Sequence, residues 1–433
     1  MIRLDSRAAD FAAQFETLLA QARETTEAVA EPVAAIIADV RTRGDAALIA
    51  LTERFDRQRL TAATIRVGAA EIDAARARVP AADLAALDLA ATRIETFHRA
   101  QMPADIALDD PAGLALGMRW NALDAVGIYV PGGKAAYPSS VLMNAVPARV
   151  AGVGRIAMCV PTPDGVMNDL VLAAAHRAGV DEVFRIGGAQ AVAALAYGTA
   201  SIAPVDRIVG PGNAYVAEAK RQVFGRVGID GIAGPSEVVI LADAANDPAR
   251  VAMDLLAQAE HDEAAQSILI ADDADFAARV IASVEAAIPR LARAAIAGAS
   301  WATHGAVIVV ADWDQAAALV DRLAPEHLQI MTADPQALFA RIRHAGSAFL
   351  GRDAPEALGD YVAGPNHVLP TGRTARFASG LSVFDFLKRT TWLSASPAGI
   401  AAIGPAAVRL ARAEGLGAHA ESVAMRIAGP GSA

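Results

Sequence analysis

The sequence predicts an α/β protein with two sheet-containing domains and helical segments at both ends. From about Asn121, short runs of β-branched residues alternate with segments of helical periodicity. This alternation is typical of βαβ units with largely parallel sheets. The first hundred residues are instead Ala-rich with few β-branched clusters, and the tail from Pro397 to Ala424 again has a helical pattern. We therefore expect helical arms on both sides of an α/β body.

The individual elements follow from apolar runs that end at turn residues. Strands are expected at 125–130, 155–160, 183–186, 206–209, 238–242, 267–271, 306–310, 327–331 and 348–350. Helices are expected between them at 169–178, 215–224, 248–260, 274–293, 315–323 and 335–344, and ahead of them at 8–23, 31–55 and 81–98. Residues 360–376 are dense in Gly, Pro, Asn and Thr and predict a loop, whereas 383–387 fits a short helix or a strand.

Composition and charge limit which partners and which cellular compartment we expect for this protein. The formal net charge is −10 and no basic run occurs, which argues against nucleic acid or an anionic membrane as a partner. The single cysteine, Cys159, lies in an apolar run and is expected to be a buried, reduced thiol. The first twenty residues carry several charges and form no apolar signal segment. We expect a cytoplasmic protein.

Three predicted strands run directly into glycine turns. These turns are Gly127-Ile-Tyr-Val-Pro-Gly-Gly133, Gly187-Gly188-Ala189-Gln190 and Gly210-Pro-Gly-Asn213. Glycine lets the backbone approach a ligand, and a helix that begins just after the turn presents N–H groups to a phosphate. The full G-x-G-x-x-G fingerprint is absent, so each turn alone favours a purely structural role. The three together favour a dinucleotide or phosphate ligand.

Two histidines lie among carboxylates, in Glu260-His261-Asp262 and Pro325-Glu326-His327. Imidazole beside carboxylate suits general-base catalysis near neutral pH and metal binding. Gln258 and His261 are three residues apart on a predicted helix, a spacing that by itself favours a solvated helix face. Glu326 and His327 follow Pro325 at a predicted turn, where a surface charge pair and a catalytic pair are equally compatible with the sequence.

Three further candidates cannot be interpreted from their own surroundings. Asp360 follows a Leu-Gly turn, and His419 ends the segment Glu414-Gly-Leu-Gly-Ala-His419. His367 lies in a Pro-Asn-His loop, which makes it another candidate for a site residue.

Several of these segments, taken in order along nearly the whole chain, resemble histidinol dehydrogenases. They are 127–133, Tyr137-Pro-Ser-Ser-Val-Leu-Met-Asn-Ala-Val-Pro147, Ala233-Gly-Pro-Ser-Glu237, Gln258-Ala-Glu-His-Asp262, Ala324-Pro-Glu-His-Leu328, 359–370 and 414–419. The resemblance implies oxidation of L-histidinol to L-histidine through L-histidinal, in two NAD-dependent steps that end histidine biosynthesis. It also implies one Zn²⁺ per subunit.

The resemblance assigns roles to individual residues. Glu326 and His327 match the catalytic acid/base pair. Three groups match binding residues: zinc ligands Gln258, His261, Asp360 and His419; substrate contacts Ser236, Gln258, His261, His327, Asp360, Glu414 and His419; and NAD contacts Tyr129, Gln190 and Asn213. Lys134 and Gly231 depart from the family pattern in size or charge, without removing a functional group.

The resemblance also implies an architecture and a quaternary structure. It implies two Rossmann-like domains in a domain-swapped homodimer, whose C-terminal helices complete the partner's active site. The expected divisions are 1–24 as a helical arm, 25–128 with 237–380 as the larger α/β domain, 129–236 as the NAD-contacting domain, and 381–433 as the C-terminal helical domain.

Three other functions are alternatives to this one. A paralogue in the same superfamily would oxidise another polar alcohol, such as a sulfonated diol, but the carboxylate of Glu414 favours an amino alcohol over a sulfonate. A zinc-stabilised nucleotide-binding scaffold would lack at least one catalytic group, and none is missing. A zinc hydrolase that uses Glu326 to activate water is disfavoured by the glycine turns and by the absence of an H-E-x-x-H helix.

Overall fold

The computed structural model describes residues 1–21, 29–132, 137–232 and 234–428. The chain forms two compact units. The first comprises Met1–Gln101 and Asp124–Phe386, and the second comprises Met102–Leu123 and Leu387–Ala433. No helix in the described ranges has both the length and the apolar composition needed to cross a bilayer.

A six-stranded parallel sheet in the first unit has the order β1-β11-β10-β9-β12-β13. Its strands are β1 (Ile2–Asp5), β9 (Glu237–Ala242), β10 (Gln266–Ala271), β11 (Ala306–Val309), β12 (His327–Met331) and β13 (Ser347–Leu350). The central strands are apolar on both faces because helices cover both sides. Val238 and Ile240 pack with one helical layer, and Val239 and Leu241 pack with the other.

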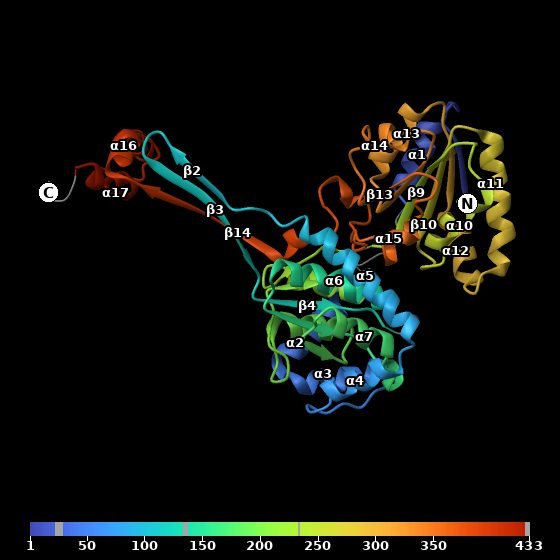
Figure 1. The fold of residues 1–433 in the computed structure, drawn as a ribbon, viewed down its shortest axis with the longest axis horizontal. Helices are drawn as coiled ribbons and strands as arrows, with labels where there is room; N and C mark the ends of the chain where they lie inside the picture. The colour runs from blue at the N-terminus through green and yellow to red at the C-terminus, as the bar shows by residue number, and fades with distance from the viewer. Residues whose placement is uncertain (22–28, 133–136, 233, 429–433) are drawn as a thin grey trace. The chain divides into compact units, whose positions relative to one another are not determined.

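Helices lie against this sheet, and those from α10 to α14 connect its strands (Figure 1). They are α1 (Phe11–Leu19), α10 (Pro248–Ala259), α11 (Ala274–Ala287), α12 (Ala294–His304), α13 (Trp313–Leu323), α14 (Pro335–Phe339) and α15 (Glu356–Tyr361). Helices α10, α11 and α12 pack on one face, and α1, α13 and α14 pack on the other.

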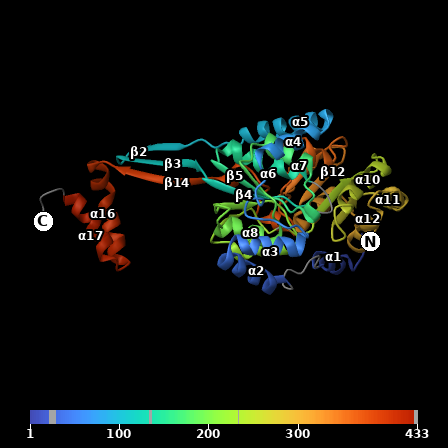
Figure 2. The ribbon, with the colours of Figure 1, turned by 90° about the horizontal axis from the view of Figure 1, so that it is seen from below.

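A five-stranded parallel sheet in the same unit has the order β6-β5-β4-β7-β8. Its strands are β4 (Ala125–Tyr129), β5 (Arg155–Cys159), β6 (Glu182–Phe184), β7 (Arg207–Val209) and β8 (Gly228–Ile229). Numbered along the chain, this order is 3-2-1-4-5, which doubly wound nucleotide-binding sheets share. Figure 2 shows helices on both sides of this sheet. They are α2 (Ala30–Arg43), α3 (Asp45–Asp56), α4 (Ala69–Arg78), α5 (Ala81–Arg99), α6 (Pro138–Ala151), α7 (Asp169–Arg177), α8 (Gly188–Tyr197) and α9 (Ala214–Val223).

The second unit is an antiparallel three-stranded sheet with a helical pair. Strand β3 (Leu114–Ala122) pairs with both β2 (Ile106–Asp110) and β14 (Leu387–Ala395). Helices α16 (Pro397–Ala413) and α17 (Gly417–Ala428) pack against each other. The C-terminal helices are as the sequence predicted, but β2, β3 and β14 were not predicted as strands.

Every strand expected in the α/β body is present, with ends shifted by no more than a few residues. Several helices differ in length. The helix expected at 31–55 is divided at Gly44, whose φ of +55° a residue with a side chain rarely adopts. The helix expected at 274–293 ends at Ala287 before a 3₁₀ turn that contains a proline, and α14 ends at Phe339 rather than near residue 344.

The packing also differs from two of the expected domain divisions. Residues 2–5 of the supposed N-terminal helical arm form β1 and pair with β11. Residues in α2 and α3 share an apolar core with α8 and α9 of the five-stranded sheet, so they do not group with 237–380 as expected. The physical reason is that an amphipathic helix can bury its apolar face on either sheet, and only the tertiary fold selects one.

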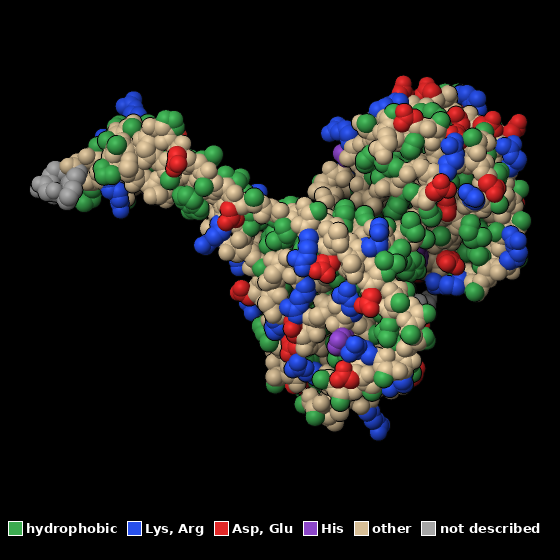
Figure 3. All heavy atoms as spheres, in the orientation of Figure 1, with side chains coloured by type: hydrophobic (Ala, Val, Ile, Leu, Met, Phe, Trp, Pro, Cys, Tyr) green, Lys and Arg blue, Asp and Glu red, His purple; other side chains and the backbone are tan. Residues whose placement is uncertain are grey.

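Charged side chains of both signs are interspersed over the visible face of the first unit (Figure 3). Cys159, at the end of β5, is a free and fully buried thiol, as predicted. Burial in an apolar environment raises the pKa of this thiol.

Candidate active site

Glu326 and His327 lie at the amino end of β12 and are both buried, with 5% and 4% of their surface exposed. The interpretation as a surface charge pair is therefore wrong. The neighbouring strand β9 holds both side chains through the backbone of its first residue, Glu237. The Glu237 N–H donates to Glu326 Oε2 at 2.9 Å, and the Glu237 carbonyl oxygen lies 3.2 Å from His327 Nδ1.

The surroundings of His327 determine which ring nitrogen carries the proton. A carbonyl oxygen can only accept, so Nδ1 carries hydrogen and donates to Glu237. Carboxylate oxygens of Glu356 and Glu326 lie 3.4 and 3.6 Å from the same nitrogen. Nε2 is left with a lone pair, is buried, and has no hydrogen-bond partner within the described ranges. The ring can therefore accept a proton at Nε2.

Burial shifts the pKa of each member of the pair in the direction that favours the neutral form. It lowers the pKa of His327 to about 3, against the opposing effect of the hydrogen bond with Glu237. Burial also raises the pKa of Glu326 well above its usual value, although the N–H of Glu237 and a hydrogen bond with Ser236 oppose the shift. The close imidazole–carboxylate contacts are thus not a charged salt bridge at neutral pH. Ser236, an expected substrate contact, lies beside Glu326.

Helix α15 brings two carboxylates to the same imidazole. Asp360 Oδ1 lies 3.7 Å from His327 Nε2, and one potential ligand atom from each of His327, Glu356 and Asp360 lies within 4.8 Å of the others. Burial raises the pKa of Asp360 to about 6 and that of Glu356 well above its usual range. Glu356 was missed by the sequence analysis, although it lies four residues before Asp360, on the same helical face.

Gln258 and His261 come from the end of α10, and Gln258 Nε2 lies 2.9 Å from His261 Nδ1. Gln258 is fully buried, so it does not belong to a solvated helix face, whereas His261, in the turn after α10, is exposed. Partial removal of water from the ring lowers the pKa of His261. The Gln258 Oε1 atom is buried without a hydrogen-bond partner in the part of the chain that the structure describes. The unpaired oxygen of Gln258, the imidazole of His261 and the carboxylate of Asp360 are each donor types that suit Zn²⁺. Asp360 also belongs to the group of close potential ligand atoms with His327 and Glu356.

His367 adjoins the same group, as its loop position suggested. Its Nδ1 lies 2.9 Å from the carbonyl oxygen of Asp360 and its Nε2 lies 3.4 Å from the Ser140 hydroxyl. Burial lowers the pKa of His367 to about 4, so this imidazole is neutral at pH 7. His367 therefore fixes the backbone at Asp360 from the side of the loop.

The three expected NAD contacts lie at the end of a strand of the five-stranded sheet or at the start of a helix that follows one. Tyr129 ends β4, and its hydroxyl accepts a hydrogen bond from the Gly188 N–H at 3.0 Å. Gln190 is buried in the first turn of α8, and Asn213 caps α9 by accepting from the N–H groups of residues 215 and 216. The carboxyl edge of such a sheet is where nucleotides bind in doubly wound folds. Lys134 and Gly133 lie outside the described residues.

The turn before Asn213 is held by a buried ion pair. Gly210 has a φ of +108°, and an added Cβ would lie 2.1 Å from the Tyr129 carbonyl oxygen. The Gly210 N–H donates to Asp230 at 2.8 Å, its carbonyl oxygen accepts from Lys220 at 3.1 Å, and Lys220 pairs with Asp230. Both side chains are almost fully buried. One charged pair therefore fixes both polar groups of the turn residue.

Replacing Lys220 with Met is expected to lower the free energy of unfolding by about 3–5 kcal/mol, because it leaves the Asp230 charge buried and unpaired. Urea unfolding measures the loss. In the double variant Lys220→Met/Asp230→Asn much of the loss should be recovered, because no buried charge remains. Arg57→Met, which breaks the exposed pair with Asp164, is the control and should cost less than about 1 kcal/mol. An equal loss in both single variants would contradict the prediction.

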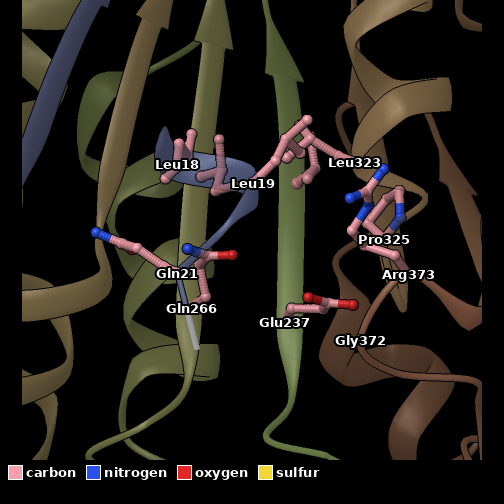
Figure 4. Close-up of a pocket in the computed structure, with 11 residues that line it drawn as sticks. Leu18, Leu19, Gln21, Glu237, Gln266, Leu323, Pro325, Gly372 and Arg373 are labelled. Carbon is pink, nitrogen blue, oxygen red and sulfur yellow. The ribbon is translucent and has the colours of Figure 1, made fainter. Parts of the chain in front are cut away.

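A cavity of about 130 Å³ is lined in part by Glu237, the residue whose backbone contacts Glu326 and His327 (Figure 4). Glu237, Gln266 and Pro325 line it together with Arg373 and with residues that end α1. None of the site residues expected from the sequence is among its described lining residues. The candidate active site is therefore the group around His327 and not this cavity.

Glu414 and His419 belong to the second unit. Glu414 follows α16 and His419 lies in α17. The group described above comes from the first unit alone, and within it the structure brings together Ser236, Glu326, His327 and Asp360, beside the Gln258–His261 pair.

The fold and the site together define an α/β protein whose first unit contains two parallel sheets, one with a buried imidazole–carboxylate centre and one with glycine turns at its carboxyl edge. The sequence model for histidinol dehydrogenase matches residues 19–427. The chain belongs to the histidinol dehydrogenase family.

Individual relatives support this assignment across the whole chain. The chain is 65% identical to histidinol dehydrogenase of Gluconobacter oxydans over 427 residues, which covers 99% of each chain. It is 61% identical to that of Ruegeria pomeroyi, with 98% of each chain covered. The crystal structure of histidinol dehydrogenase from Elizabethkingia anophelis is similar with a TM-score of 0.94 and 35% identity, and covers 99% of this chain and 98% of that one. The resemblance found in the sequence is confirmed.

Proposed function

We propose that this protein oxidises L-histidinol to L-histidine through L-histidinal, with NAD as the oxidant, as the last steps of histidine biosynthesis. The observation that carries the proposal is the state of His327, a buried neutral imidazole with Nδ1 held by Glu237 and Nε2 free to accept a proton. Full-length similarity to histidinol dehydrogenases supports the choice of substrate. Bound NAD supplies the hydride acceptor in each of the two oxidations.

His327 would act as the general base for the alcohol. Its Nε2 takes the hydroxyl proton as the C–H bond of the substrate breaks, and the Glu237 carbonyl keeps the ring in the required tautomer. An imidazole with a pKa of about 3 is a weak base by itself. The carboxylate of Asp360, 3.7 Å from Nε2, would stabilise the imidazolium as it forms.

Glu326 would serve the second oxidation. An aldehyde must be hydrated before it can lose a second hydride. Burial raises the pKa of Glu326 above its ordinary value, which makes its carboxylate form a stronger base toward that water. The Glu237 N–H and Ser236 hold this carboxyl group beside His327. His327 can then accept the proton of the hydrate. The buried position of both groups protects the reactive aldehyde from bulk water.

Gln258, His261 and Asp360, together with the partner subunit's His419, would hold one Zn²⁺ per subunit. When bound, the metal supplies a fixed positive centre that orients the substrate. The unpaired Gln258 Oε1 atom supports this ligand set, because a buried oxygen without a partner is costly unless something occupies it.

The remaining expected residues would bind the substrate or the cofactor. Ser236 and the partner subunit's Glu414 would bind the polar end of the substrate. Tyr129, Gln190 and Asn213 would contact NAD at the carboxyl edge of the five-stranded, Rossmann-like sheet. A domain-swapped, cytoplasmic homodimer with two composite sites follows from this proposal.

The test is to incubate the zinc-loaded protein with L-histidinol and excess NAD and to count NADH per histidinol consumed. We expect two NADH per histidinol and L-histidine as the product. One NADH with accumulating aldehyde would contradict the two-step proposal. No NADH from a zinc-loaded dimer would indicate a paralogue, and sulfonated diols would be the next substrates.

A further inference from the structure

Gln329 has no role in the proposed mechanism, yet its side chain joins three elements of the site. It lies on β12 two residues after His327, and therefore on the same face of the strand, and is 1% exposed. Its Nε2 donates to Asp254 Oδ2 on α10 at 2.7 Å. Its Oε1 accepts from the Glu356 N–H at the start of α15 at 3.2 Å.

The two helices that Gln329 connects carry the expected metal-binding side chains. Asp254 lies four residues before Gln258 on α10, which is one helical turn. Glu356 lies four residues before Asp360 on α15. A single amide thus spans from the strand that carries His327 to the helices that carry Gln258 and Asp360.

The chemistry of the two partners fixes how the amide is oriented. A carboxylate can only accept a hydrogen bond and a backbone N–H can only donate one. Only an amide with nitrogen toward Asp254 and oxygen toward Glu356 satisfies both, and a flipped amide would leave both unpaired. A carboxylate or an aliphatic side chain at this position would lose at least one of the two bonds.

We propose that Gln329 is a positioning residue that sets the distance between α10 and α15, and with it the geometry of the Gln258–His261 pair relative to Asp360. It touches neither substrate nor cofactor and acts through these helices. The inference rests on the proposed function, because zinc binding is the property that this geometry serves.

The test uses Gln329→Glu and a designed rescue. In the single variant the new carboxylate faces Asp254, so the two helices are pushed apart. We expect the affinity for Zn²⁺, measured by competition with a chromogenic chelator, to fall about 10–100-fold. We expect kcat/KM for L-histidinol to fall similarly, with the KM for NAD unchanged. Adding Asp254→Asn restores both hydrogen bonds, because the new amide can donate to the new carboxylate, which still accepts from Glu356.

The double variant Gln329→Glu/Asp254→Asn should bind zinc within about threefold of the unmodified protein. Gln222→Glu is the matched control, because Gln222 also donates to a carboxylate, Glu218, at 2.7 Å, but on α9. This control should lower the melting temperature without changing zinc affinity.

Several results would overturn the inference. They are a folded Gln329→Glu with normal zinc affinity, a folded double variant that is not rescued, and a control that loses as much zinc affinity. If the single variant does not fold, the zinc affinity of the double variant alone decides whether the role proposed for Gln329 holds. An unmodified protein that neither binds zinc nor forms NADH would overturn the proposed function itself, whereas an active one with the wrong variant pattern overturns only the role of Gln329.

Discussion

Replacing Glu326 with Gln is expected to slow the oxidation of L-histidinal by about 100-fold or more, while the oxidation of L-histidinol to L-histidinal slows far less. The amide keeps the size of the carboxyl group and can still accept from the Glu237 N–H. It cannot take a proton from the water that hydrates the aldehyde. Stopped-flow measurement with L-histidinol should therefore show a fast first NADH followed by a slow second one.

Two further measurements make this prediction specific. L-Histidinal supplied directly should show the full loss in rate, because only the hydration-dependent step remains. Glu285→Gln, at an exposed position on α11, is the control and should leave both steps unchanged. Equal losses in the two oxidations would argue against a role for Glu326 in hydration and in favour of a general effect on the site.

The variants His261→Asn and His419→Asn are each expected to lose most of their bound zinc and their activity, yet to recover activity when their subunits are mixed. His261 lies in the first unit and His419 in the second, and the proposal takes these two residues of each site from different subunits. A heterodimer then has one site with both substitutions and one intact site. Random exchange of equal amounts produces heterodimers in half of the dimers, so about one quarter of the normal activity should return.

The control for this experiment is a demonstration that subunits exchange, for example by mass spectrometry of a tagged and an untagged chain. Zinc content of the purified heterodimer should be about half that of the unmodified dimer. If exchange occurs and neither zinc nor activity returns, the two histidines belong to the same subunit's site, and the composite-site proposal fails.

The strands of both parallel sheets could be predicted because they are buried on both faces and read as apolar runs that end at turns. Strand β12, for example, has the same limits in the sequence and in the structure. β1 was missed because it is short and carries charges, as edge strands often do. β14 was missed because most of its side chains are exposed within its unit, so no apolar run marks it.

The candidate site was only partly predictable. The histidines next to carboxylates and the glycine turns indicated acid–base chemistry and a nucleotide, and the resemblance assigned roles to particular residues. Glu356 and Gln329 carried no signal of their own. Their importance follows from the pairing of β12 with β9 and from the packing of α10 and α15 around β12.

Local elements, the residue types of the site and, through the motifs, the family could all be derived from the amino-acid sequence. Tertiary structure decided which sheet each helix covers, and it decided that Glu326 and His327 are buried rather than exposed. It also placed them at the amino edge of their sheet, where the backbone of Glu237, some ninety positions earlier in the chain, holds both. The reason is physical: periodicity depends on neighbours along the chain, whereas burial and hydrogen bonding in the site depend on strands that meet only in the folded protein.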